Sequence, residues 1–252
     1  MNFAPVIDAL ALPADARVDQ RVPKKLLLEQ GAPTAADKRQ IQDGVEEMHW
    51  IAALKPTNIG VPEYRDEVRE YLEIAVLTVS FRMAAKATRL TELIHRAIPY
   101  PVVLVSGQGE TASLSLAHKR WSQGEAGRVV IEEVRRTAPF HPEALEAQEA
   151  LFLASLPLSS LPASNLFALY QGWIDRLIGL EAARITGNFS PPDSVERSAS
   201  LRDRLASHAR LQYELATLRT QAAKEKQLNR RVEVNMTIKR LEAELADLKT
   251  KL

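Results

Sequence analysis

The sequence predicts an α/β (α+β) protein: an N-terminal domain with a mixed sheet of about four strands flanked by helices, then a helical segment and a long C-terminal coiled-coil helix or helical hairpin. Aromatic residues make up 6% of the 252 residues and Gly only 10 of them, which argues against a β-sandwich or propeller. A run of β-branched residues within 71–81 is typical of a buried strand. Residues 193–252 contain neither Gly nor Pro, which favours long helix.

The first part of the chain predicts an irregular segment followed by two helices. Residues 1–20 are punctuated by Pro and Asp, which predicts irregular structure. Pro23 stands at a favourable first-turn position for a short helix that Gly31 ends. Thr34 is expected to cap a second helix that Pro56 ends. Apolar residues recur at helical spacing along this second helix: Ile41, Val45, Met48, Trp50, Ile51 and Leu54.

Four stretches predict the strands of one mixed sheet: Tyr71–Phe81, Val102–Val105, the alternating residues Leu114 and Leu116, and Arg128–Val134. The first is long and free of Gly and Pro, so we expect it to be covered on both faces. A helix from about Thr88 to Ala97 connects it to the second strand. Gly107-Gln-Gly109 predicts a tight hairpin turn between the second and third strands. We expect this α/β domain to span 21–136.

The C-terminal part of the chain predicts helices. Residues 137–192 form a Pro-rich linker with helices near Glu143–Ala154 and Ser164–Thr186, and residues 193–252 form a basic coiled-coil tail. Two apolar series in the tail have heptad spacing: Leu211, Leu215, Leu218 and Ala222, then Val234, Ile238, Leu241, Leu245, Leu248 and Leu252. The two series are not in one frame, so either the seam drifts or the helix turns back as a hairpin.

The net charge of +1 hides a basic tail, because Val195–Leu252 holds 13 Lys and Arg against 8 Asp and Glu. The charge is most one-sided where the heptad frame breaks, which predicts a contact surface for an acidic partner or DNA phosphates. The candidate binding residues of this stretch are Lys226, Asn229, Arg230, Arg231 and Asn235. The alternatives are a solvated helix face, or buried Asn side chains that fix the register of a coiled coil.

A second group of polar residues occurs at the end of the helix that precedes the second predicted strand, and along the third predicted strand, which follows the hairpin turn. The candidates here are His95, Arg96, His118, Lys119 and Arg120. If these residues lie close together, their cations suit a phosphate or a nucleic acid strand. The alternative is the ordinary polarity of strand ends and helix caps.

Several kinds of chemistry are not indicated. The chain has no Cys, which excludes disulfides, thiolate metal sites and thiol catalysis. Its five His lack the spacing of a helical metal pair, and no nucleophile motif occurs. We therefore expect no catalytic residues, no metal and no cofactor. Short apolar runs and an acidic N-terminal stretch predict neither a membrane span nor a secretory signal, so we expect a cytoplasmic location.

Five sequence blocks occur in this order: Trp50–Ile59, Arg69–Ile74, Leu93–Val102, Ser115–Gln123 and Lys226–Asn235. Together they resemble a bacterial family catalogued as domain of unknown function 4391, and the resemblance runs from about Pro23 to Leu252. The family has no established activity, so the resemblance carries over no catalytic roles. Genes of this family often stand beside DNA methyltransferase and helicase genes in phage-defence or restriction-like islands. The resemblance therefore implies a methyltransferase or helicase partner.

The first functional hypothesis is a non-catalytic accessory or assembly subunit of such a DNA-targeting system, which binds a partner protein, with DNA as a further candidate. The second is a nucleic-acid-processing enzyme with a degenerate site near Glu73, His95, His118 and Lys119, which requires these side chains to converge in one cleft. The third is a self-associating coiled-coil protein that forms a homo-oligomer through its tail.

Overall fold

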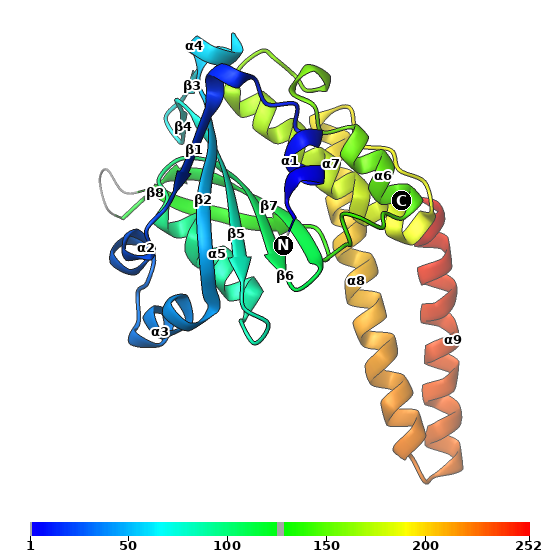
Figure 1. The fold of residues 1–252 in the computed structure, drawn as a ribbon. Coiled ribbons are helices and arrows are strands. Elements are labelled where there is room, and N and C mark those ends of the chain that lie inside the picture. The colour runs from blue at the N-terminus through cyan, green and yellow to red at the C-terminus, as the bar shows by residue number, and fades with distance from the viewer. Residues whose placement is uncertain (1, 125–128) are drawn as a thin grey trace. The chain divides into compact units, whose positions relative to one another are not determined.

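The structure, a computed structural model, describes residues 2–124 and 129–252 (Figure 1). The predicted strand start at Arg128 therefore lies outside the described residues. The chain divides into two compact units, residues 1–177 and 178–252, which are described one at a time.

The first unit is built of strands and short helices. Its helices are α1 (Ala4–Ala9), α2 (Lys24–Gln30), α3 (Ala35–Gly44), α4 (Pro56–Ile59), α5 (Ala87–Ala97), α6 (Ala147–Ala154) and the first part of α7 (Leu166–Thr186). Its strands are β1 (Arg17–Arg21), β2 (Val45–Leu54), β3 (Tyr64–Arg65), β4 (Glu70–Tyr71), β5 (Ile74–Phe81), β6 (Val102–Gln108), β7 (Thr111–Trp121) and β8 (Val129–Arg136).

Within the described residues, six strands form a mixed sheet in the order β1-β2-β5-β6-β7-β8. Neighbouring strands are antiparallel except β5 and β6, which are parallel and joined by α5. The mixed sheet flanked by helices agrees with the predicted fold class. The expected number of about four strands was too low, because β1 and β2 also belong to the sheet.

The stretch Val45–Leu54 is a strand, and its assignment to a helix was wrong. Its buried residues include Val45, Met48 and Ala52, which are three and four positions apart. The pairing with β5 explains this spacing, since its register shifts between Val45 and Glu47 and again between Trp50 and Ala52. Each irregularity changes which face a residue points to, so the bulged strand imitates the period of a helix.

The expectation of irregular structure in residues 1–20 was also wrong. This segment contains α1, a short 3₁₀ helix (Ala14–Ala16) and most of β1. β1 pairs antiparallel with β2, with Gln20 opposite Trp50. The two errors are connected, because β1 cannot be recognised as a strand while its only neighbour in the sheet is taken for a helix.

The core of the unit lies around β5, all eight residues of which are buried. The sequence predicted a buried strand over Tyr71–Phe81, but the strand begins at Ile74, and Tyr71 belongs to β4, which pairs with β3 in a separate sheet. One face of the sheet packs against α2, α3 and α5 through a shared apolar cluster that includes Leu27, Ile41, Leu77, Leu90 and Leu104. We refer to this as the α5 face. The predicted caps are confirmed, since Gly31 follows α2 and the Thr34 hydroxyl accepts the backbone N–H of Asp37 at 3.1 Å.

The predicted hairpin between β6 and β7 is confirmed. Gly109 occupies its turn with φ of +62°, a left-handed conformation that favours Gly. Gln108 donates from its side-chain amide to the backbone oxygens of Arg82, Met83 and Ala85, each at 3.0 Å. The turn thereby fixes the loop that leads from β5 into α5.

The second unit contains the end of α7 and two long helices, α8 (Val195–Lys224) and α9 (Leu228–Thr250). The side chain of Ser194 caps α8 by accepting the N–H of Arg197 at 3.2 Å. No helix in the described part of the chain is both long enough and apolar enough to cross a membrane.

Candidate interaction surface at the hairpin tip

The two long helices of the second unit form an antiparallel hairpin, joined by the three residues Glu225 to Gln227 (Figure 1). Their contact is an apolar seam, with Leu211, Leu215, Ile238 and Leu241 buried and Leu218, Ala222, Val234, Leu245 and Leu248 packed beside them. The heptad residues of the tail therefore bury one another within the chain.

The hairpin explains the break in the heptad frame. The first apolar series belongs to α8 and the second to α9, and two helices that run in opposite directions need no common frame. Arg219 and Glu242 link the helices by an ion pair with 2.7 Å between guanidinium and carboxylate. Of the two arrangements that the sequence left open, one helix or a hairpin, the chain adopts the hairpin.

We define the hairpin tip as residues 224–236, the end of α8, the connection and the first turns of α9. The candidate binding residues of the tail all lie here, and all are exposed: Lys226, Asn229, Arg230, Arg231 and Asn235. In the part of the chain that the structure describes, the cations of the tip form no ion pair. Since both Asn are exposed, neither is a buried residue that fixes the register of the seam.

A stripe of exposed apolar side chains lies on the same tip. Leu228 is 65% exposed, Val232 49% and Met236 67%, at spacings of four residues along α9. Val232 and Met236 each precede a seam residue by two positions, which places them about 200° around the helix from the seam. The stripe therefore lies on the face of α9 opposite α8. The stripe could not be predicted from the sequence, because the face of α9 that points outward depends on how α9 packs against α8.

The polar residues predicted in the first unit separate into different places. On the α5 face, Lys119 of β7 donates from Nζ to the backbone oxygens of His95 and Ile98, the latter at 2.6 Å. These carbonyls belong to the end of α5, where a cation is favourable. Lys119 is 2% exposed, and burial lowers the pKa of its ammonium group to about 7. The ammonium group of Lys119 therefore caps the C-terminal end of α5 from inside the protein.

His95 is fully buried beside Lys119, with its Nε2 3.1 Å from the Ser115 hydroxyl. Its Nδ1 has no hydrogen-bond partner in the described structure. Burial, with the charge of Lys119 as a smaller cause, lowers the pKa of His95 to about 3. The imidazole is therefore neutral at physiological pH and cannot contribute a positive charge to a binding site.

His118 lies on the other face of the sheet, because successive residues of a strand point to opposite sides. Its Nδ1 is 2.5 Å from the Tyr71 hydroxyl and its Nε2 is 2.8 Å from Oε1 of Gln171 on α7. The Gln171 oxygen can only accept, so Nε2 carries the proton and Nδ1 accepts from Tyr71. Burial is the main cause that raises the pKa of Tyr71, which keeps its hydroxyl protonated as a donor.

The remaining candidates have local partners. Arg96 pairs with Glu92 at 2.6 Å, Arg120 donates to the backbone oxygen of Trp121 at 3.3 Å, and Glu73 pairs with Lys55 at 3.2 Å. Glu73, His95, His118 and Lys119 therefore do not converge in one cleft. Among residues 2–124 and 129–252, no group of three or more His, Asp or Glu side chains is placed to hold a metal ion.

The fold and the surface define an α+β protein that carries a basic helical hairpin. The family described as Domain of unknown function (DUF4391) matches residues 10–245. This range covers most of the chain, so the protein belongs to that family. No curated protein and no solved structure matches the chain.

Proposed function

We propose that this protein is a non-catalytic accessory subunit of a bacterial DNA-targeting system, and that its hairpin tip binds an acidic surface of a partner protein. The observation that supports the proposal is the combination, on one short stretch, of exposed apolar side chains and cations without acidic partners.

The apolar stripe favours a protein over DNA as the occupant. Leu228, Val232 and Met236 gain free energy when they leave water for an apolar surface, and a phosphate backbone offers none. Exposed apolar groups bordered by charge are typical of protein interaction sites.

The cations favour a partner whose surface is acidic. Arg231 is three residues from Leu228, and Lys239 is three residues from Met236, spacings that make side chains neighbours on a helix. Glu225 and Glu233 also lie in the tip, but its cations outnumber them, four to two. A net positive charge beside an apolar centre favours an acidic partner over a basic one. The partner classes implied by the family resemblance, a DNA methyltransferase or a helicase, are the first candidates to test.

The test uses the full chain co-expressed with a methyltransferase and with a helicase from its own host. The variant Val232→Ser with Met236→Ser removes the apolar centre. The control Tyr213→Ser removes an apolar side chain that is 77% exposed on α8, outside the tip. We expect the first variant to weaken binding of one partner by about tenfold or more, as loss of central apolar contacts does. The control should bind as the unchanged protein does.

Three results would contradict the proposal. One is that the unchanged protein binds neither the methyltransferase nor the helicase, or that the double variant binds them as well as the unchanged protein does. Another is a DNA affinity that falls with salt and depends on Arg230 and Arg231 but not on Val232 and Met236, which would identify a nucleic acid surface. The third is a dimer of the chain alone that becomes a monomer in the double variant, as measured by light scattering, which would assign the stripe to a second copy.

A further inference from the structure

A pocket lies on the α5 face where the parallel strands β5 and β6 end. β5, α5 and β6 form a β-α-β unit, so a short loop from the carboxyl end of β5 leads into the first turn of α5. In sheets with parallel strands, the region beyond the carboxyl ends is where ligands bind, and a helix that starts there directs free N–H groups toward them.

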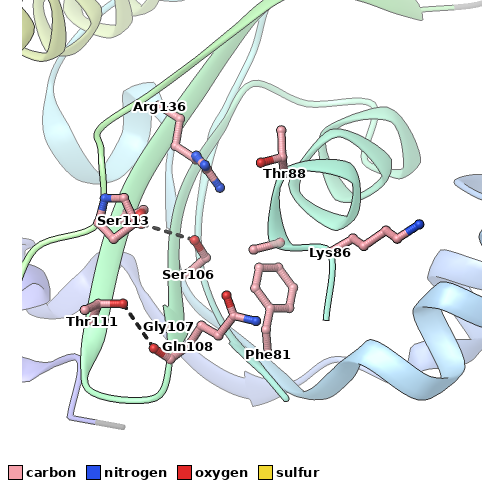
Figure 2. A pocket seen from close by; sticks show the side chains of 11 residues that line it. Phe81, Lys86, Thr88, Ser106, Gly107, Gln108, Thr111, Ser113 and Arg136 are labelled. Carbon is pink, nitrogen blue, oxygen red and sulfur yellow. Dashed lines mark hydrogen bonds between the residues drawn. The ribbon is translucent and has the colours of Figure 1, made fainter. Parts of the chain in front are cut away.

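The pocket has a volume of about 290 Å³ and is lined by residues from three separate parts of the chain. The lining residues on which the argument depends are Thr88 at the start of α5, Ser113 of β7 and Arg136 of β8. Figure 2 shows that the Arg136 side chain reaches from β8 toward Thr88 at the start of α5. The Lys86 side chain points away from this space.

The charge of the pocket is positive. Arg136 forms no ion pair and no hydrogen bond with the described residues, and no Asp or Glu is among the residues that line the pocket. An Arg remains charged at physiological pH even when it is half-buried. Its neighbour Arg135 points to the other face of the sheet and pairs with Glu133 at 2.6 Å. Arg136 is thus a cation held at a cavity without a counterion among the described residues.

Most polar groups of the pocket are already paired: the hydroxyls of Ser106 and Thr111 donate to the backbone oxygens of Ser113 and Gln108. Two kinds of donor remain for a ligand. No side chain caps α5, so the backbone N–H of Thr88 in its first turn has no partner within the helix, whereas that of Ala87 donates to the Ala85 oxygen at 3.0 Å. Ser113 is only 5% exposed, and its hydroxyl has no hydrogen-bond partner in the described part of the chain. The hydroxyl oxygen is not sealed from the pocket, so it can donate to a ligand bound there.

We propose that this pocket binds a phosphomonoester, with the phosphoryl group between the Arg136 guanidinium, the first turn of α5 and the Ser113 hydroxyl. A phosphoryl dianion uses each of these features: the bidentate donors of Arg, the positive end of the helix and a hydroxyl donor. The volume lies at the lower end of the range for small-molecule pockets, which fits a phosphorylated sugar or mononucleotide. This site is separate from the proposed function of the hairpin tip.

The experiment measures binding to the full chain by isothermal titration calorimetry. The probes are inorganic phosphate, ribose 5-phosphate, AMP, and one DNA oligonucleotide with a 5′-phosphate or a 5′-hydroxyl. The variants are Arg136→Gln and Ser113→Ala, with Arg135→Gln as the matched control on the opposite face. We expect Arg136→Gln to weaken binding of a phosphomonoester by about tenfold or more and Ser113→Ala by a smaller factor. The control should bind within about twofold of the unchanged protein.

The choice of probes distinguishes a small phosphorylated ligand from the 5′-phosphate of a DNA end. Binding of ribose 5-phosphate or AMP that depends on Arg136 identifies a small ligand, and binding only of the 5′-phosphorylated oligonucleotide identifies a DNA end. The proposal is wrong if no probe binds at millimolar concentration, or if the two oligonucleotides bind equally and no small probe binds. It is also wrong if Arg136→Gln binds as well as Arg135→Gln. Thermal denaturation of each variant confirms that it is folded.

Discussion

The two units use the same kinds of side chain in opposite ways. In the first unit, Lys119 is buried and its ammonium group is held by two backbone oxygens at the end of α5. At the hairpin tip, Lys224, Arg230 and Arg231 are exposed and pair with no acid in the described structure. Removing a charge should therefore affect folding in the first unit and recognition in the second.

The largest expected effect is that of Lys119→Met in the first unit. The change leaves the backbone oxygens of His95 and Ile98 buried without their donor, which should lower the free energy of unfolding by about 3 kcal/mol. Urea denaturation measures this loss. The control Lys224→Met, at an exposed tip position, should stay within about 0.5 kcal/mol. A loss below about 1 kcal/mol for Lys119→Met would show that the interior charge does not stabilise the unit.

The second-largest expected effect is a loss in the free energy of unfolding at acidic pH, caused by protonation of His95 in the unfolded chain. His95 has a pKa of about 3 in the folded protein, whereas an unfolded His titrates near 6.5. The unfolded chain binds more protons between these values, so the contribution of His95 is complete above about pH 6.5 and is lost as the pH falls toward 3. At pH 5 the loss from His95 should be about 2 kcal/mol.

This pH effect is measured by urea denaturation at pH 8 and pH 5. His95→Gln should lose about 2 kcal/mol less than the unchanged protein over this range. His49→Gln, which alters a partly exposed His of β2, should show the full loss. Equal losses in all three proteins would mean that His95 is not the buried neutral imidazole that the structure describes.

A smaller difference is expected between two Thr residues. Thr34 caps α3, and Thr34→Ala should lower the free energy of unfolding by about 1 kcal/mol because the N–H of Asp37 loses its acceptor. Thr217 lies within α8 and only donates back to the Tyr213 oxygen, so Thr217→Ala should be neutral or slightly stabilising. Thermal denaturation of the two variants compares their losses of stability. A greater loss for Thr217→Ala than for Thr34→Ala would contradict this prediction.

Elements with a regular pattern could be predicted from the sequence, whereas irregular ones could not. The caps of α2 and α3, the buried β5 and the β6–β7 hairpin follow from local signals such as Thr34, Gly31 and Gly109. β2 could not be recognised, because its two register shifts give its apolar residues a helical spacing. A bulge depends on the partner strand, which a single segment does not reveal.

The candidate sites show the same limit. The exposed basic residues of the tip were predictable, because their charge and the broken heptad frame occur within one short stretch. The close approach of Lys119 to the end of α5 was also anticipated, but its burial was not. The Arg136 pocket was missed, since its residues come from three distant segments and no phosphate-binding motif joins them.

The central claim is that the tip cations serve recognition and not folding. The most direct test measures partner affinity and melting temperature together for the full chain with Arg230→Gln and Arg231→Gln. Because Gln favours helix and both positions are exposed, the melting temperature should change by no more than about 1 °C. The affinity should fall about tenfold or more, and its dependence on salt should decrease. An unchanged affinity and salt dependence, or a clear loss of stability, would contradict the claim.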